Sequence, residues 1–151
     1  MTVDNRDGTE PSPRKESQSP NHGGPSIAAA IREFDLLSEI EQLQNGRTYE
    51  HGGPSGRTLL KEQDLRIVLI ALKAGGRMEE HSASGPSSIH VLEGLVRVHL
   101  ANRQAELGPG YLLALESAVR HDVEALEDSA FLLTLGRTKY EHVSDSHEPK
   151  A

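Results

Sequence analysis

From Arg57 onward, apolar residues recur at alternate positions in short runs, and turn residues separate one run from the next. The runs are 58–60, 65–72, 88–92, 95–100, 112–115, 119–126 and 130–135. A period of two is the repeat of a β-strand, because successive side chains point to opposite faces. Glycine and proline lie between the runs, as in Gly75-Gly76, Gly85-Pro86 and Gly108-Pro109-Gly110. Short strands at this spacing, with no helical pattern between them, predict an all-β sandwich or barrel.

The sequence before the β pattern divides into two parts. Residues 1–25 are rich in proline, serine, glycine and charge, and such a segment buries too little apolar surface to offset its ordering entropy. We therefore predict a disordered tail over 1–25, a helical segment over 26–46, a β domain over 47–137 and a polar tail over 138–151.

The helical segment is predicted from a stripe of Leu36, Leu37, Ile40 and Leu43, which lie on one side of a helix. Asp35 is placed to cap its start, and Asn45-Gly46 to end it in a left-handed conformation. Ser26 could begin an earlier turn through Ile31, so the pattern leaves one helix or two open.

Composition excludes several classes of function. The chain has 151 residues, enough for one domain, with a net charge of −7 and no cysteine. It therefore lacks disulfides, thiolate chemistry and the basic field that attracts nucleic acid or an anionic membrane. The N-terminus has no apolar core typical of a secretory signal, and no apolar run reaches the length of a membrane span. We expect a cytoplasmic protein.

Alternation also assigns side chains to faces. In 119–126 the odd positions are apolar except for His121 and the even positions are mostly charged, so His121 should point inward. The run 65–72 is apolar on both faces, which requires a cover on both. That cover is either the N-terminal helix or a second subunit, and we expect a homodimer on this ground.

The spacing of glycines and histidines resembles the cupin superfamily. Its first motif, G-x5-H-x-H-x3-4-E-x6-G, is matched by Gly75, His81 and Gly94, and its second, G-x5-P-x-G-x2-H-x3-N, by Gly110 and His121. The local sequences 80–86, 91–94, 106–110 and 123–128 also resemble small bacterial cupins. The resemblance implies a double-stranded β-helix, the RmlC-like jelly-roll barrel, with an N-terminal α-helix, and makes 47–137 a cupin domain.

The resemblance also implies a site and shows where this chain departs from it. Metal-bearing cupins hold one divalent ion with three histidines and a glutamate. Here Ala83 stands at the second histidine's position and Ser87 at the glutamate's, so only His81 and His121 carry over as metal ligands. The implied cofactor is one divalent transition metal (Fe, Mn, Zn or Ni) or none, because firm sites usually supply three or four protein donors. The predicted ligand pocket is lined by His81, Ala83, Ser87, Ile89 and His121.

The remaining histidines are predicted to lie outside this pocket. If Ser87 points inward, so do Ile89 and Val91, which turns His90 outward. His99 lies on the opposite face of its strand from the apolar Val96 and Val98, so it is also predicted to point outward. A histidine on an apolar strand face can also be a hydrogen-bonded core residue, and serines nearby could satisfy it.

The sequence leaves three functions open. The first is a protein with a reduced metal site that binds a small, partly apolar organic ligand, with or without a divalent metal. The second is a metal-dependent enzyme of dioxygenase or isomerase type, acting on a small organic acid, sugar or phenol through His81 and His121. A metal-free isomerase with a histidine as base is a further possibility, although no acid partner is evident. No sequence feature identifies catalytic residues.

Overall fold

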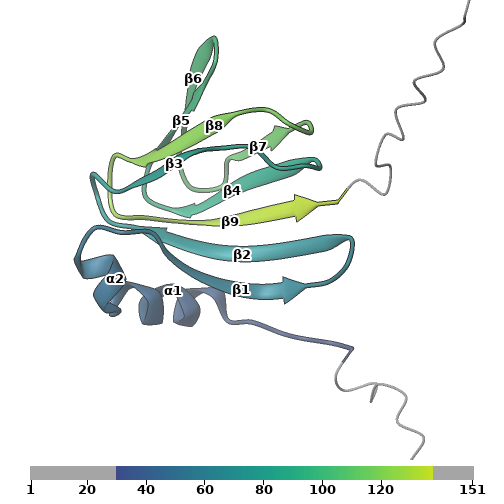
Figure 1. Ribbon diagram of the computed structural model, residues 1–151. Helices are drawn as coiled ribbons and strands as arrows, with labels where there is room; N and C mark the ends of the chain where they lie inside the picture. Colours follow the sequence, from purple (N-terminus) through teal and green to yellow (C-terminus); the bar gives the residue numbers. More distant parts are fainter. Residues whose placement is uncertain (1–29, 138–151) are drawn as a thin grey trace, which may run out of the picture. The chain divides into compact units, whose positions relative to one another are not determined.

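The computed structural model describes residues 30–137, and it contains two short helices followed by β-strands (Figure 1). The helices are α1 (Leu36–Gln44) and α2 (Arg47–Glu50). The strands are β1 (Ser55–Lys61), β2 (Leu65–Leu72), β3 (Arg77–His81), β4 (Ser87–Glu93), β5 (Val96–Leu100), β6 (Arg103–Leu107), β7 (Leu112–Leu115), β8 (His121–Ala125) and β9 (Ser129–Gly136). The tails predicted over 1–25 and 138–151 lie outside the described residues.

The strands form two antiparallel sheets that enclose one apolar core. One sheet has the strand order β1-β2-β9-β4-β7 and the other β3-β8-β5-β6. All pairings within them are antiparallel. The core between the sheets includes Val68, Ile70, Ile89, Val98, Val123 and Phe131. This is an all-β fold, as the alternating runs and glycine turns predict, and it is the jelly roll with an N-terminal helix that the cupin resemblance implies.

One turn contains a glycine because its backbone conformation and close packing leave no room for a side chain. Gly94, between β4 and β5, has φ +81°, and a Cβ there would lie 2.3 Å from the carbonyl oxygen of Asp128. A side chain at this position would meet both a strained backbone and a clash. The sequence signal Glu93-Gly94 therefore marks a turn for a definite steric reason.

Helix α1 covers the outer face of β2. Ile40 and Leu43 are buried in a second apolar cluster with Leu59, Leu69 and Ala71, while the alternate β2 residues point into the barrel. The two apolar faces of β2 are thus accounted for by the barrel core on one side and the helix on the other. The observation that suggested a homodimer no longer requires a second subunit, and the homodimer stays a prediction.

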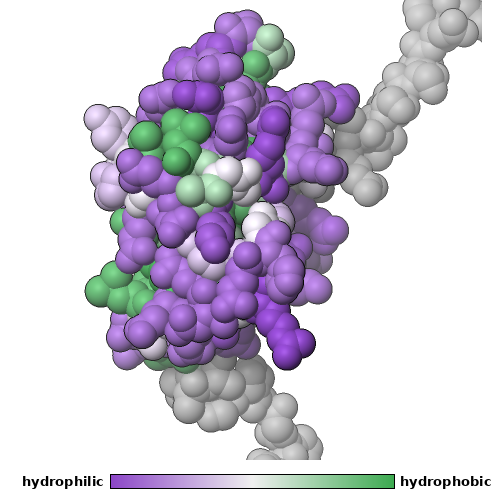
Figure 2. Space-filling view, turned by 90° about the vertical axis from the view of Figure 1, so that its left-hand side faces the viewer, coloured by the Kyte–Doolittle hydropathy of each residue, from purple (hydrophilic) through white to green (hydrophobic). Residues whose placement is uncertain are grey.

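On the face shown in Figure 2, apolar side chains form separate small patches among hydrophilic ones. This face therefore does not require a second subunit to cover it either. Exposed large apolar residues include Leu37 on α1 and Tyr111 and Leu112 at the start of β7. No helix among residues 30–137 has both the length and the apolar character that crossing a bilayer requires.

The start of α1 is as predicted, and its end differs. The helix begins at Leu36, and the side chain of the predicted cap Asp35 accepts a hydrogen bond from the Ser38 amide at 3.3 Å. Residues 31–35 are not helical, and residues 26–29 lie outside the described residues. The predicted left-handed stop at Asn45-Gly46 is wrong, because both residues have φ −84°. Gly46 instead precedes the single turn of α2, and the left-handed glycine is Gly52, with φ +81°.

Two strands were absent from the sequence prediction. Strand β3 has the sequence RMEEH and β6 the sequence RQAEL, so neither shows a clear apolar alternation. Strand β8 begins at His121, later than the run from Val119, because Ala118 has φ +63° and its amide donates to Ala83 across the loop. The differences at β3 and at the start of β8 lie at the predicted site, because these strands carry His81 and His121.

Candidate functional site

His81 and His121 lie side by side on neighbouring strands β3 and β8. Their ring centroids are 4.3 Å apart, with the ring planes at 60°, and the two residues are paired across the ladder. His121 shares its face of β8 with Val123 and Ala125, both buried in the core, so it points inward. The two histidines are therefore on the barrel side of this sheet.

The inward position of His81 depends on a β-bulge in β3. Met78 pairs with Val123, and His81 pairs with His121, so three steps on β3 match two steps on β8. In a regular ladder, Glu80 would take the place opposite His121 and His81 would point outward. The extra residue turns His81 inward and leaves Glu80 on the outside, where it binds Arg120 at 2.6 Å.

Each imidazole is held by a backbone carbonyl two residues before it. Nδ1 of His81 lies 2.8 Å from the oxygen of Glu79, and Nδ1 of His121 lies 3.0 Å from that of Val119. A carbonyl oxygen can only accept, so both Nδ1 atoms donate and carry the proton in the neutral ring. The lone pair of each neutral ring is then on Nε2.

Nε2 of His121 is buried and has no hydrogen-bond partner among the described residues. The side chain as a whole is 2% exposed. Burial lowers the pKa of His121 below its ordinary value of 6.5; the carbonyl of Val119 opposes this shift and the neighbouring His81 adds to it. A neutral imidazole with a free, buried acceptor nitrogen results.

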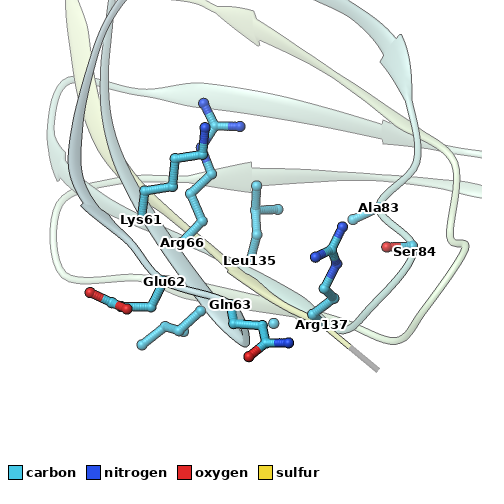
Figure 3. A pocket seen from close by; sticks show the side chains of 10 residues that line it. Lys61, Glu62, Gln63, Arg66, Ala83, Ser84, Leu135 and Arg137 are labelled. Atoms are coloured by element: carbon cyan, nitrogen blue, oxygen red, sulfur yellow. The ribbon is translucent and has the colours of Figure 1, made fainter. Parts of the chain in front are cut away.

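The other predicted pocket residues are divided between two places. Ser87 and Ile89 are buried on the inner face of β4, in the opposite sheet, with Ile89 part of the apolar core. Ala83 lies instead in the wall of a cavity of about 310 Å³ (Figure 3). Other residues of that wall are Lys61, Arg66, Ser84, Leu135 and Arg137, and neither histidine is among them.

His90 and His99 lie outside the pocket, as predicted. His90 alternates with the buried Ile89 and Val91 on β4 and is on the opposite face. On the outer face of β5, Nδ1 of His99 is hydrogen-bonded to the carboxylate of Asp122, and its Nε2 lies 3.8 Å from Glu124. Neither side chain can join His81 and His121 around one ion.

The residues present are too few for a tightly held metal ion. Two imidazole nitrogens are available, and the described part of the chain contains no group of three histidine, cysteine or carboxylate side chains that could hold an ion. Ala83 and Ser87 stand where the resemblance places further ligands, and neither is a metal donor of that kind.

Comparison with known proteins identifies the fold. No protein-family model and no curated protein matches the sequence. Among solved structures, a conserved protein of unknown function from Streptococcus pyogenes is 25% identical, with 72% of this chain and 90% of that one covered and a TM-score of 0.59. A cupin superfamily protein from Desulfitobacterium hafniense is 18% identical, with 71% and 92% covered and a TM-score of 0.60.

An RmlC-like cupin from Desulfovibrio desulfuricans is 21% identical, with 70% of this chain and 96% of that one covered and a TM-score of 0.59. The chain therefore has the fold of the small RmlC-like cupins, which is the fold that its motifs predict. The matched structures supply a fold and no reaction.

Proposed function

We propose that this protein binds a small organic ligand inside its barrel and recognises it through the Nε2 atoms of His81 and His121. The observation that carries the proposal is the buried, unpartnered Nε2 of His121. A buried acceptor without a partner destabilises a folded protein by about 1–3 kcal/mol, so such an atom is usually satisfied by something. A ligand hydroxyl or amine would supply the missing donor.

The surroundings define the ligand in outline. Both histidines carry the Nδ1 proton, so both present acceptors, and the nearby core residues Val123 and Ile89 are apolar. A partly apolar molecule with one or two hydroxyl groups fits this chemistry. Phenols, small hydroxy acids and sugars all have such groups.

A divalent transition metal is the second candidate occupant. It would find two imidazole ligands here, and the remaining positions would be open to water or substrate. That arrangement would favour a metal-dependent enzyme rather than a binding protein. The donor count makes it the weaker proposal, and a metal assay separates the two.

The histidine tautomers provide the first test. In protein labelled with ¹⁵N, long-range proton–nitrogen spectra near pH 8 should show His81 and His121 protonated at Nδ1 and bare at Nε2. Addition of phenol, lactate or xylose at millimolar concentration should shift the His121 Nε2 resonance for the probe that binds. A spectrum with the His121 proton on Nε2 would contradict the proposal.

Matched variants then locate the binding. His121→Phe and His81→Phe should abolish the response to the probe, while His90→Gln, on the outer face of β4, should leave it unchanged. Metal content should be measured on the same untagged proteins. Near-stoichiometric metal that disappears in both phenylalanine variants would replace the ligand proposal with the metal-dependent enzyme.

A further inference from the structure

A second feature, independent of the histidine pair, is the charge of the cavity beside Ala83. Its wall contains the cationic side chains of Lys61, Arg66 and Arg137 and one acidic side chain, Glu62. Three positive charges against one negative charge leave an excess of two positive charges, in a chain whose net charge is −7. Such a local reversal of sign is unusual enough to need a structural cause.

The cause is that the sheet register directs these side chains toward the inside of the barrel. Arg66 is in step with the inward-facing Val68 and Ile70 on β2, and Arg137 continues the inward row of Leu133 and Leu135 on β9. Arg66 also pairs with Leu135 across the ladder. Each arginine therefore lies at the end of a row of apolar, inward-facing side chains, at the same end of the barrel.

A β-bulge adds Lys61 to the same face. Thr58 pairs with Val68 and Leu60 with Ile67, so one extra residue lies in β1 between Thr58 and Leu60. The shift places Lys61 opposite Arg66, and directly paired residues share a face. Without the bulge, Lys61 would point to the helix side of the sheet.

Within the described part of the chain, no carboxylate neutralises these three cations. None of Lys61, Arg66 and Arg137 forms an ion pair with a residue in the described range 30–137; the one side-chain contact of Arg66 is to the Thr58 hydroxyl at 3.5 Å. In Figure 3, Lys61 and Arg66 extend in the same direction, Arg137 reaches toward Ala83, and the carboxylate of Glu62 points away from Arg137. Adjacent like charges repel, and an anion between them would remove the repulsion.

We propose that this cavity binds a small organic carboxylate, with Arg66 and Arg137 donating to the carboxylate oxygens and Lys61 adding charge. Guanidinium groups match a carboxylate with two parallel hydrogen bonds. The apolar side chains of Leu65 and Leu135 and the methyl of Ala83 offer contact for the carbon part of the ligand. A volume of about 310 Å³ is at the small end of ligand pockets, so the carboxylate is a small one.

Calorimetric titration with malonate, succinate and benzoate tests the proposal, with malonamide as the neutral analogue of malonate and inorganic phosphate as an anion without a carbon part. At least one carboxylate should bind saturably with a dissociation constant below about 10 mM at low ionic strength, and malonamide should not. The absence of saturable binding by all three carboxylates would overturn the proposal. Phosphate binding as tight as the best carboxylate would overturn the assignment to an organic ligand.

Charge-neutral variants locate the carboxylate. Arg66→Gln, Arg137→Gln and Lys61→Gln should each raise the dissociation constant about fivefold or more, and Arg66→Lys should weaken binding despite its retained charge. The matched control is Arg103→Gln, an exposed residue of β6 in the other sheet, which removes the same charge. If Arg103→Gln weakens binding as much as Arg66→Gln, the effect is that of net charge and the site is refuted.

Discussion

The interior of the barrel differs at its two ends, although the same strands build both. At one end, inward positions are filled by Leu72, Val91, Ala125 and Phe131, all 1% exposed or less. At the other end, the same inner rows finish in polar residues: Arg66 on β2, Ser87 on β4, His121 on β8 and Arg137 just after β9. Arg66 and Ser87 are both paired with Leu135, from the two strands on either side of β9, so they lie at the same level of the barrel.

This difference separates stability from binding within one core. Apolar burial at the first end contributes free energy of folding in proportion to the area removed from water. The polar end contributes little of that kind. It contains the buried Nε2 of His121 and three cationic side chains, and none of these has a hydrogen-bond or ion-pair partner of opposite kind among residues 30–137, apart from the hydrogen bond of Arg66 to Thr58. Substitutions at the apolar end should therefore reduce stability, and substitutions at the polar end should reduce ligand binding.

The largest expected effect on stability is at the apolar end. Phe131→Ala should lower the free energy of unfolding by about 3–5 kcal/mol, because the ring is fully buried and its removal leaves a cavity. Urea denaturation monitored by circular dichroism measures the loss. A loss below about 1 kcal/mol would show that the two ends do not differ as described.

His121→Phe, at the polar end, should change the free energy of unfolding by less than about 1.5 kcal/mol. The variant loses the hydrogen bond to Val119 and also removes the buried acceptor that had no partner. These two effects oppose one another. The same urea experiment compares it directly with Phe131→Ala, and an equal loss in both variants would break the contrast between the ends.

The pH dependence of stability sharpens the contrast further. The pKa of His121 in the folded protein is below 6.5, so between that pKa and 6.5 the unfolded chain binds more protons than the folded one. The free energy of unfolding should fall as the pH is lowered from about 7 to 5, and the fall should be shallower in His121→Phe. Parallel slopes in the two proteins would contradict the burial of a neutral His121.

The smallest expected effect on folding is at the mouth. Arg66→Gln should alter the free energy of unfolding by no more than about 0.5 kcal/mol, since the side chain is exposed and has no ion pair with a described residue. Thermal unfolding measures it. A pronounced stabilisation would show that repulsion between the cations, rather than ligand binding, dominates this cavity.

The sequence predicts much of the fold because the regular strands carry a clean alternation. His121 is identified as inward by its apolar neighbours Val119, Val123 and Ala125, and the run 65–72 is recognised as covered on both faces. The inward position of Arg66 was missed, although this residue is in step with Val68 and Ile70. The signal was available, but a charged residue at the end of a strand is more commonly solvated.

The remaining parts of the site could not be predicted from alternation. β3 is too polar to be recognised as a strand, and His81 was identified only through the spacing it shares with the cupin motif. β-Bulges decide which face of the sheet His81 and Lys61 point to. Each bulge interrupts the alternation of inward and outward side chains just before the residue in question, so the alternation cannot be used to assign its face. A bulge is visible only when the partner strand is known.

The bulge in β3 also bears on changes in chain length. Two residues of β3 face one residue of β8 there, so removal of one of them would restore a regular ladder and still leave His81 opposite His121. Deletion of one residue from a regular strand would instead exchange inside for outside along everything that follows. This segment of the barrel can therefore exist in two lengths with the same imidazole presented to the interior.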